Sequence, residues 1–226
     1  MRTFDLVIFD CDGTLVDSLA GIAAAARLAL ADCGLDAQVD TAAVAGVVGL
    51  NLDQAMASLL PDHDPNLHAR VVDRYRHHYQ RLADARELDN PLFPGVRGVL
   101  NGLQAAGMTL AVATGKSRRG LERTLNDHNL HGFFQALKTA DQAPSKPHPA
   151  MVLEILAETG HPPARALMVG DTDFDILMGR NAGVTTCAVT YGCHARERLA
   201  AARPDHWIDH MAELPGVLGL EVPGLL

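Results

Sequence analysis

Two aspartates, one residue apart, follow an apolar run near the start of the chain. The run, Leu6 to Phe9, is typical of a buried strand, and Asp10 and Asp12 come directly after it. Carboxylates at the tip of a buried strand need partners, because an unpaired charge is costly to bury. Carboxylate oxygens are ligands that Mg²⁺ prefers, and an aspartate held in such a site can act as a nucleophile. The pair is therefore a candidate metal and catalytic site, although a plain Asp-Gly turn is also common.

Three later stretches carry polar residues where strands are expected to end or helices to begin. They are Thr114-Gly115-Lys116, Ser145-Lys146-Pro147 and Gly170-Asp171. Taken alone, Thr114 is typical of any strand end, and Lys146 is typical of a solvated surface. Taken together and in order, the three stretches indicate one site that is assembled from several strand ends.

Six short apolar segments alternate with amphipathic helical patterns along most of the chain. The expected strands cover residues 6–9, 109–113, 136–139, 166–169, 185–189 and 206–208. Such alternation predicts an α/β protein with a doubly wound parallel sheet. Ligands of these sheets bind at the carboxyl ends of the strands. We therefore expect Asp10, Asp12, Thr114 and Asp171 to converge on one crevice.

Residues 16–90 interrupt this alternation with helical patterns only. Asp17 or Ser18 is expected to cap the first helix of this segment, and the cluster Pro91-Leu92-Phe93-Pro94-Gly95 marks its end. The histidines of the segment are scattered, which favours a solvated face over a zinc site. The sequence thus predicts two domains: a core made of residues 1–15 and 91–226, and an all-helical domain made of residues 16–90.

Composition limits the expected partners of the protein. Lys and Arg number 19 and Asp and Glu number 27, which gives a formal net charge of −8 at pH 7. Nucleic acid and anionic membranes are not expected partners, because the chain has no basic run, and no apolar run approaches the length of a membrane span. The four cysteines show no paired spacing and are expected to be free thiols in a reducing cytoplasm.

The strand ends supply groups that bind a metal and a phosphate. Asp10, Asp12 and Asp171 offer enough oxygen ligands for one Mg²⁺. The hydroxyl of Thr114 and the N–H groups of the turn at Gly115-Lys116 offer an anion site at a helix start. The expected ligands are therefore Mg²⁺ and the phosphate of a small metabolite.

The same residues suggest a mechanism of phosphoryl transfer. Asp10 would attack the phosphorus and form an aspartyl-phosphate. Asp12 would protonate the leaving oxygen and then deprotonate the water that hydrolyses the intermediate. Lys146 would bind the phosphate and neutralise its charge. Asp175 could orient Lys146 or a metal-bound water, or it could, like Asp173, simply favour a helix N-terminus.

In four motifs the chain resembles the haloacid dehalogenase superfamily of phosphatases. The motifs are Asp10-Cys11-Asp12-Gly13-Thr14-Leu15, Val112-Ala113-Thr114-Gly115-Lys116, Ser145-Lys146-Pro147, and Val169-Gly170-Asp171-Thr172 through Asp175. The resemblance covers nearly the whole chain and implies a Rossmann-like core with a helical cap inserted after the first motif. Residues 16–90 lie where that cap belongs.

Within the superfamily the chain is most similar to the phosphoglycolate phosphatase-like branch. This resemblance implies a phosphatase of 2-phosphoglycolate or of a similar small metabolite, with Gly49 and Leu50 in the loop that contacts the substrate. Inorganic pyrophosphatase and nucleotidase activities stay open as alternatives. A sugar-phosphate mutase is disfavoured because no Arg lies near Leu52, and a non-catalytic sensor is disfavoured because the catalytic set is complete. The sequence does not distinguish a monomer from a homodimer.

Overall fold

One parallel sheet forms the centre of the structure. In residues 3–35 and 40–220, which the computed structural model describes, the strands are β1 (Leu6–Phe9), β2 (Thr109–Thr114), β3 (Ala136–Thr139), β4 (Ala166–Gly170), β5 (Thr185–Val189) and β6 (His206–Ile208). Their order is β3-β2-β1-β4-β5-β6, and every neighbouring pair is parallel. The doubly wound α/β fold predicted from the sequence is therefore confirmed. Strands β2 and β4 each run one residue further than expected, to Thr114 and Gly170.

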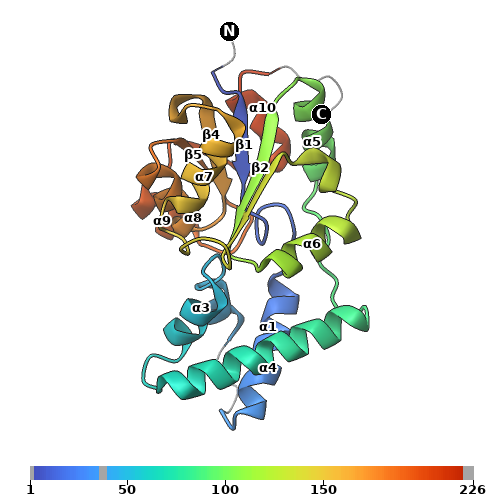
Figure 1. Cartoon of the computed structure of the whole chain (residues 1–226), viewed down its shortest axis with the longest axis vertical. Helices are drawn as coiled ribbons and strands as arrows, with labels where there is room; N and C mark the ends of the chain where they lie inside the picture. The colour runs from blue at the N-terminus through green and yellow to red at the C-terminus, as the bar shows by residue number, and fades with distance from the viewer. Residues whose placement is uncertain (1–2, 36–39, 221–226) are drawn as a thin grey trace.

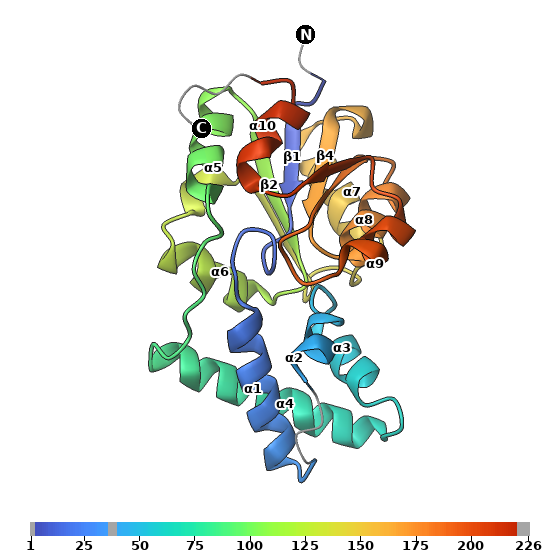
Figure 2. The ribbon, with the colours of Figure 1, turned by 180° about the vertical axis from the view of Figure 1, so that it is seen from behind.

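Helices cover both faces of the sheet (Figures 1 and 2). One face packs against α5 (Val96–Ala105), α6 (Arg118–Asp127) and α10 (Leu214–Val217), and the other against α7 (Ala150–Thr159) and α8 (Asp173–Asn181), with α9 (Arg196–Ala202) beside α8. The side chains of β1 alternate between these faces: Val7 and Phe9 belong to the first apolar cluster, and Leu6 and Ile8 to the second. This alternation is the period of two that a strand imposes, and it explains why the whole run is apolar.

The remaining helices lie together at the carboxyl edge of the sheet (Figure 1). They are α1 (Leu19–Asp32), α2 (Thr41–Ala45), α3 (Leu52–Leu59) and α4 (Pro65–Asp84). They share apolar clusters of their own, in which Leu30 and Met56 pack with Val71 and Val72. The described residues between 17 and 90 contain no strand, as the helical pattern predicted. The assignment of residues 16–90 as a separate cap domain stays a prediction.

Two adjacent chain segments connect the helical part to the sheet. The N–H of Asp17 donates to the carbonyl of Pro91 at 2.9 Å, and the N–H of Phe93 donates to the carbonyl of Leu15 at 3.0 Å. The chain enters residues 16–90 through the first of these segments and leaves through the second. The two connections between the helical part and the sheet therefore lie side by side.

The C-terminal part of the described chain belongs to the core. Leu214 and Leu218 are buried in the cluster beneath α5, while residues 221–226 lie outside the described residues. Within the described ranges, no helix combines the length and the apolar character that crossing a membrane would require.

Candidate active site

The sheet order brings the first and last polar motifs to one place. Strand β1 lies between β2 and β4, with Phe9 opposite Val112 in one neighbour and Val169 in the other. The residues that follow these positions, Asp10 on one strand and Asp171 on the next, therefore emerge side by side at the carboxyl edge. A crevice at this edge is where doubly wound sheets bind ligands.

A buried cluster of three carboxylates and one ammonium occupies this edge. One carboxylate oxygen from each of Asp10, Asp171 and Asp175 lies within 4.8 Å of the others. The Nζ of Lys146 lies 2.7 Å from Oδ1 of Asp10 and 2.6 Å from Oδ1 of Asp175. None of these four residues is more than 1% exposed. Lys146 is therefore a buried structural cation and not the solvated lysine that its sequence position alone would suggest.

Burial shifts the protonation equilibria of this cluster. It raises the pKa of Asp10 well above the usual range for a carboxyl, against the opposing effect of Lys146. It also raises the pKa of Asp171 to about 6, with a further contribution from Asp175. Burial would lower the pKa of Lys146, but attraction to Asp10 and Asp175 outweighs it and raises that pKa. The carboxylates thus lack sufficient positive charge around them.

The cluster fits a divalent cation. Three carboxylates face a single ammonium, and Oδ2 of Asp10 is buried without a hydrogen-bond partner in the described part of the chain. A buried polar atom without a partner is rare unless an ion or water belongs there. Hard cations such as Mg²⁺ take carboxylate oxygens as ligands. Asp10, Asp171 and Asp175 are therefore the side chains that would hold the metal.

The backbone is packed closely around Asp171. Its Oδ1 accepts from the Thr14 hydroxyl and its Oδ2 from the N–H of Cys193, both at 2.8 Å. A Cβ on Gly13 would lie 2.1 Å from Oδ2 of Asp171, and one on Gly192 would lie 2.2 Å from its Cβ. Only glycine fits at these two positions, so the orientation of Asp171 is fixed from several sides.

The side chain of Asp12 lies in a different setting from the one expected. Both of its carboxylate oxygens contact Nζ of Lys116, at 2.6 and 2.8 Å, and the hydroxyl of Ser18 donates to Oδ1. It is absent from the described carboxylate cluster that could hold a metal. The structure thus pairs the side chain of Asp12 with a cation, and the predicted part of Asp12 in the metal site stays a prediction. Ser18 holds the N-cap position of α1 but makes no capping hydrogen bond with its side chain, because its backbone has φ −109° and ψ −1° and not the extended conformation of a capping residue.

The loop from Gly46 to Asn51 contacts the sheet edge directly. A Cβ on Gly115 would lie 2.5 Å from the carbonyl oxygen of Gly49 and 2.6 Å from that of Leu50. The N–H of Asn51 donates to the Ser145 hydroxyl at 2.9 Å. The predicted loop at Gly49-Leu50 is therefore in van der Waals contact with the predicted phosphate-binding turn.

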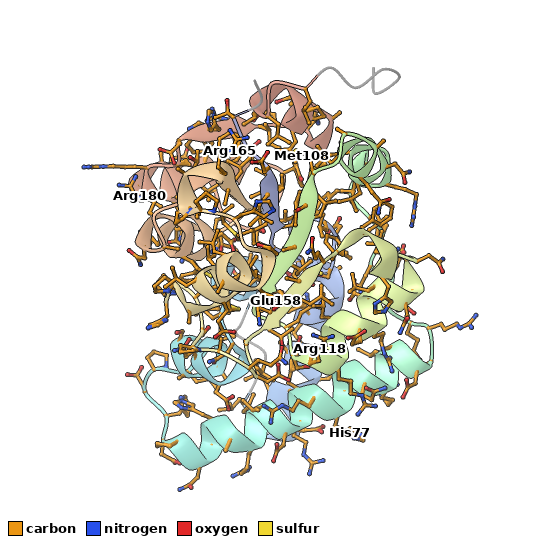
Figure 3. The ribbon with its side chains drawn as sticks, turned by 45° about the horizontal axis from the view of Figure 1, so that its top comes forward. His77, Met108, Arg118, Glu158, Arg165 and Arg180 are labelled. Atoms are coloured by element: carbon orange, nitrogen blue, oxygen red, sulfur yellow. The ribbon has the colours of Figure 1, made fainter. Side chains whose placement is uncertain are left out.

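A cavity of about 850 Å³ lies between the sheet edge and the helices. Asp10, Asp12, Thr114 and Lys116 line its side near the sheet, and residues of α1, α3 and α4 line the other. Residues of α4 and of the first half of α6 both line this space, and Figure 3 marks the two helices by the labels His77 and Arg118. The described lining excludes Lys146, Asp171 and Asp175. Those three lie behind Asp10, which is the group that joins the buried cluster to the cavity.

Several contributors to the site were not predicted. Thr14 belongs to the first motif, where a hydroxyl beside two aspartates could have been recognised as a hydrogen-bond donor. Ser18 was assigned to helix capping only. The N–H of Cys193 acts through the backbone, so no side-chain pattern could reveal it. The catalytic and binding roles of the residues that were predicted stay predictions, although the structure does bring them to one edge.

Comparisons with known proteins agree with the fold and identify the family. A family model described as haloacid dehalogenase-like hydrolase matches residues 7–189. The "Probable phosphatase IndB" of Dickeya dadantii is 37% identical over 217 residues, covering 93% of this chain and 92% of that protein. The phosphoglycolate phosphatase of Yersinia pestis is 32% identical over 219 residues, covering 95% and 93%. A crystal structure from Haemophilus somnus, described as a predicted phosphoglycolate phosphatase, superposes with a TM-score of 0.86 at 26% identity, covering 96% and 99%.

Proposed function

The chain belongs to the haloacid dehalogenase-like hydrolases and is a phosphatase of that family, and we propose that it hydrolyses a small phosphorylated metabolite through an aspartyl-phosphate. One observation carries the proposal: Asp10 has a buried oxygen that finds no hydrogen-bond partner among the described residues, and it lies at the cavity beside Asp12. The names of curated relatives, such as the phosphoglycolate phosphatase of Yersinia pestis, suggest 2-phosphoglycolate as a substrate to test, and esters with larger leaving groups are the alternative. The free cysteines fit a reducing compartment such as the cytoplasm.

In the first half-reaction, an oxygen of Asp10 attacks the phosphorus and the ester bond breaks. Lys146 fixes Asp10 through the contact at 2.7 Å, which holds the nucleophile in one orientation. Asp12 supplies a proton to the leaving oxygen. Lys116 pairs with Asp12 in the free enzyme, so the dianionic phosphoryl group, on entering, would draw Lys116 away, and Asp12 would take up a proton from water before it acts as the acid.

In the second half-reaction, water attacks the phosphorus and the Asp10 carboxylate leaves. Asp12, now deprotonated, takes the proton of that water, and inorganic phosphate is released. Thr114 and the turn that follows it orient the phosphoryl oxygens. Mg²⁺ bound at Asp10, Asp171 and Asp175 would neutralise negative charge on those oxygens.

A panel of substrates tests the proposed function. Phosphate release is measured from 2-phosphoglycolate, pyrophosphate, sugar phosphates and nucleoside monophosphates, with Mg²⁺ and with chelator. We expect one monoester to have the highest kcat/KM. A preference for pyrophosphate or a nucleotide would assign the alternative activities, and no release from any compound would contradict the assignment as a phosphatase.

The Mg²⁺ concentration that the enzyme requires for activity should increase as the pH falls. Chelator is expected to reduce phosphate release to background, because Lys146 alone would not offset the three clustered carboxylates. The proton competes with the metal for Asp171, whose pKa is about 6. Below pH 6, the Mg²⁺ concentration for half-maximal activity should therefore rise by up to about tenfold per pH unit. A Mg²⁺ requirement that stays constant between pH 7 and pH 5 would contradict this.

Residues 16–90 are proposed to act as a cap that positions the substrate, and Gly115→Ala tests this role. The new Cβ would lie 2.5 Å from the Gly49 carbonyl, so the loop or the turn must move by about an ångström. Misplacement of this size can cost about a hundredfold in rate, and we expect kcat/KM to fall by about ten- to a hundredfold. Gly132→Ala, where a Cβ meets nothing within 4 Å, is the control and should match the parent enzyme.

A further inference from the structure

The wall of the cavity opposite Asp10 is mostly apolar. It includes Ile22, Ala26, Val44, Val48, Met56 and Leu59. An apolar wall around a few placed polar groups is the usual make-up of a site that binds an organic ligand. A substrate made only of a phosphate and a two-carbon acid is polar throughout. Such a substrate would leave this apolar wall exposed to water.

Two tyrosines of α4 stand next to the proposed acid catalyst. The rings of Tyr75 and Tyr79 are stacked, with centroids 5.8 Å apart and an interplanar angle of 24°. The Nζ of Lys116 lies 5.9 Å from the Tyr79 ring centroid, and the same ammonium contacts Asp12 at 2.6 Å. Both tyrosines line the cavity. A group attached to the oxygen that Asp12 protonates would therefore share its cavity with these rings.

The cations of the cavity are already paired with carboxylates of the protein. Arg76 lies 3.7 Å from Asp53, and Arg123 lies 2.6 Å from Asp84. Arg81 likewise pairs with Glu87 at 3.8 Å. These partners compete with any carboxylate on the ligand. In the part of the chain that the structure describes, Arg119 lines the cavity without an ion pair.

Arg119 does not by itself favour an acidic substrate, because it is exposed at the start of α6. An exposed cation binds a carboxylate weakly, since water and salt screen the attraction. The described lining of the cavity thus offers apolar and aromatic surface for the leaving group, and it contains no unpaired buried cation that could bind a glycolate carboxylate.

Resting on the proposed phosphatase function, we propose that the leaving group of the physiological substrate carries a flat ring, which binds against Tyr75 and Tyr79. The site then selects phosphomonoesters of ring-bearing alcohols over those of small acids. Offset stacking on aromatic side chains favours flat rings, and burial of the ring against the apolar wall adds to that preference.

Binding of phosphonates that cannot be hydrolysed tests this directly. Benzylphosphonate and methylphosphonate carry the same charged group and differ in the ring. By calorimetry with the full chain and Mg²⁺, we expect benzylphosphonate to bind at least about tenfold more tightly. Tyr79→Leu and Tyr75→Leu, which keep an apolar side chain, should each reduce this ratio severalfold. Arg70→Ala, at an exposed position of α4 outside the described cavity lining, is the control and should leave the ratio unchanged.

Turnover of benzyl phosphate and methyl phosphate separates this inference from the proposed function. The two leaving alcohols have similar acidity, so the ring is the main difference, and kcat/KM should be at least about tenfold higher for benzyl phosphate. Equal binding of the two phosphonates, or equal turnover of the two esters, would overturn the inference while leaving the phosphatase intact. If no ester were hydrolysed, the proposed function would fail, and the phosphonate ratio would still decide whether the ring site exists.

Discussion

Replacement of Asp10 by Asn is expected to lower kcat for phosphate release by about a thousandfold or more. The amide cannot act as the nucleophile that forms the aspartyl-phosphate. Asp171 and Asp175 lie close by, but neither lines the cavity in the described structure. The measurement is kcat on the best substrate of the panel, with Mg²⁺ in excess.

The same variant should fold normally, which separates loss of chemistry from loss of structure. Asp10→Asn removes one of three clustered negative charges, so its melting temperature in chelator should be no lower than that of the parent. Acid-quenched parent enzyme should carry labelled phosphate from the substrate, whereas the variant should carry none. Asp127→Asn, at an exposed position of α6, is the matched control. A variant that kept a tenth of the parent's turnover would exclude Asp10 as the nucleophile.

The strands, and the polar residues that follow them, could be predicted because each is marked by a short pattern of apolar and polar residues in the sequence. The run at residues 6–9 has to be apolar throughout, since its two faces are both covered. The carboxyl ends of parallel strands all lie at the same edge of the sheet. This is why Asp10 and Asp171, distant in sequence, could be expected at one edge before any coordinates were known.

The pairing of side chains within the site could not be predicted in the same way. Asp10 and Asp12 are equivalent in the sequence pattern, yet one contacts Lys146 and the other contacts Lys116. Which lysine reaches which carboxylate depends on the direction of two turns that follow different strands. The contact between Gly49 and Gly115 likewise depends on how the helical part docks on the sheet, and the helical pattern carries no information on that.

Among the positively charged residues of the site, Lys146 is expected to contribute most to the stability of the folded protein. Its removal as Lys146→Met leaves Asp10, Asp171 and Asp175 buried without a neutralising cation. Breaking a buried ion pair by removal of one partner costs about 3–5 kcal/mol in the free energy of unfolding. Lys138→Met is the matched control, because Lys138 pairs with Glu154 and Glu158 at the surface, where a pair is worth about 1 kcal/mol or less.

The destabilisation by Lys146→Met should increase as the pH rises. The carboxyls of Asp10 and Asp171 have higher pKa values in the folded chain than their usual value of 3.8, and loss of Lys146 raises them further. The folded chain then binds more protons than the unfolded chain, so stability falls with increasing pH above about 4. Denaturant unfolding in chelator should therefore show a smaller deficit at pH 5 than at pH 8, and Mg²⁺ should restore part of it. A deficit that did not vary with pH or Mg²⁺ would mean that lost packing, and not unbalanced charge, explains the effect.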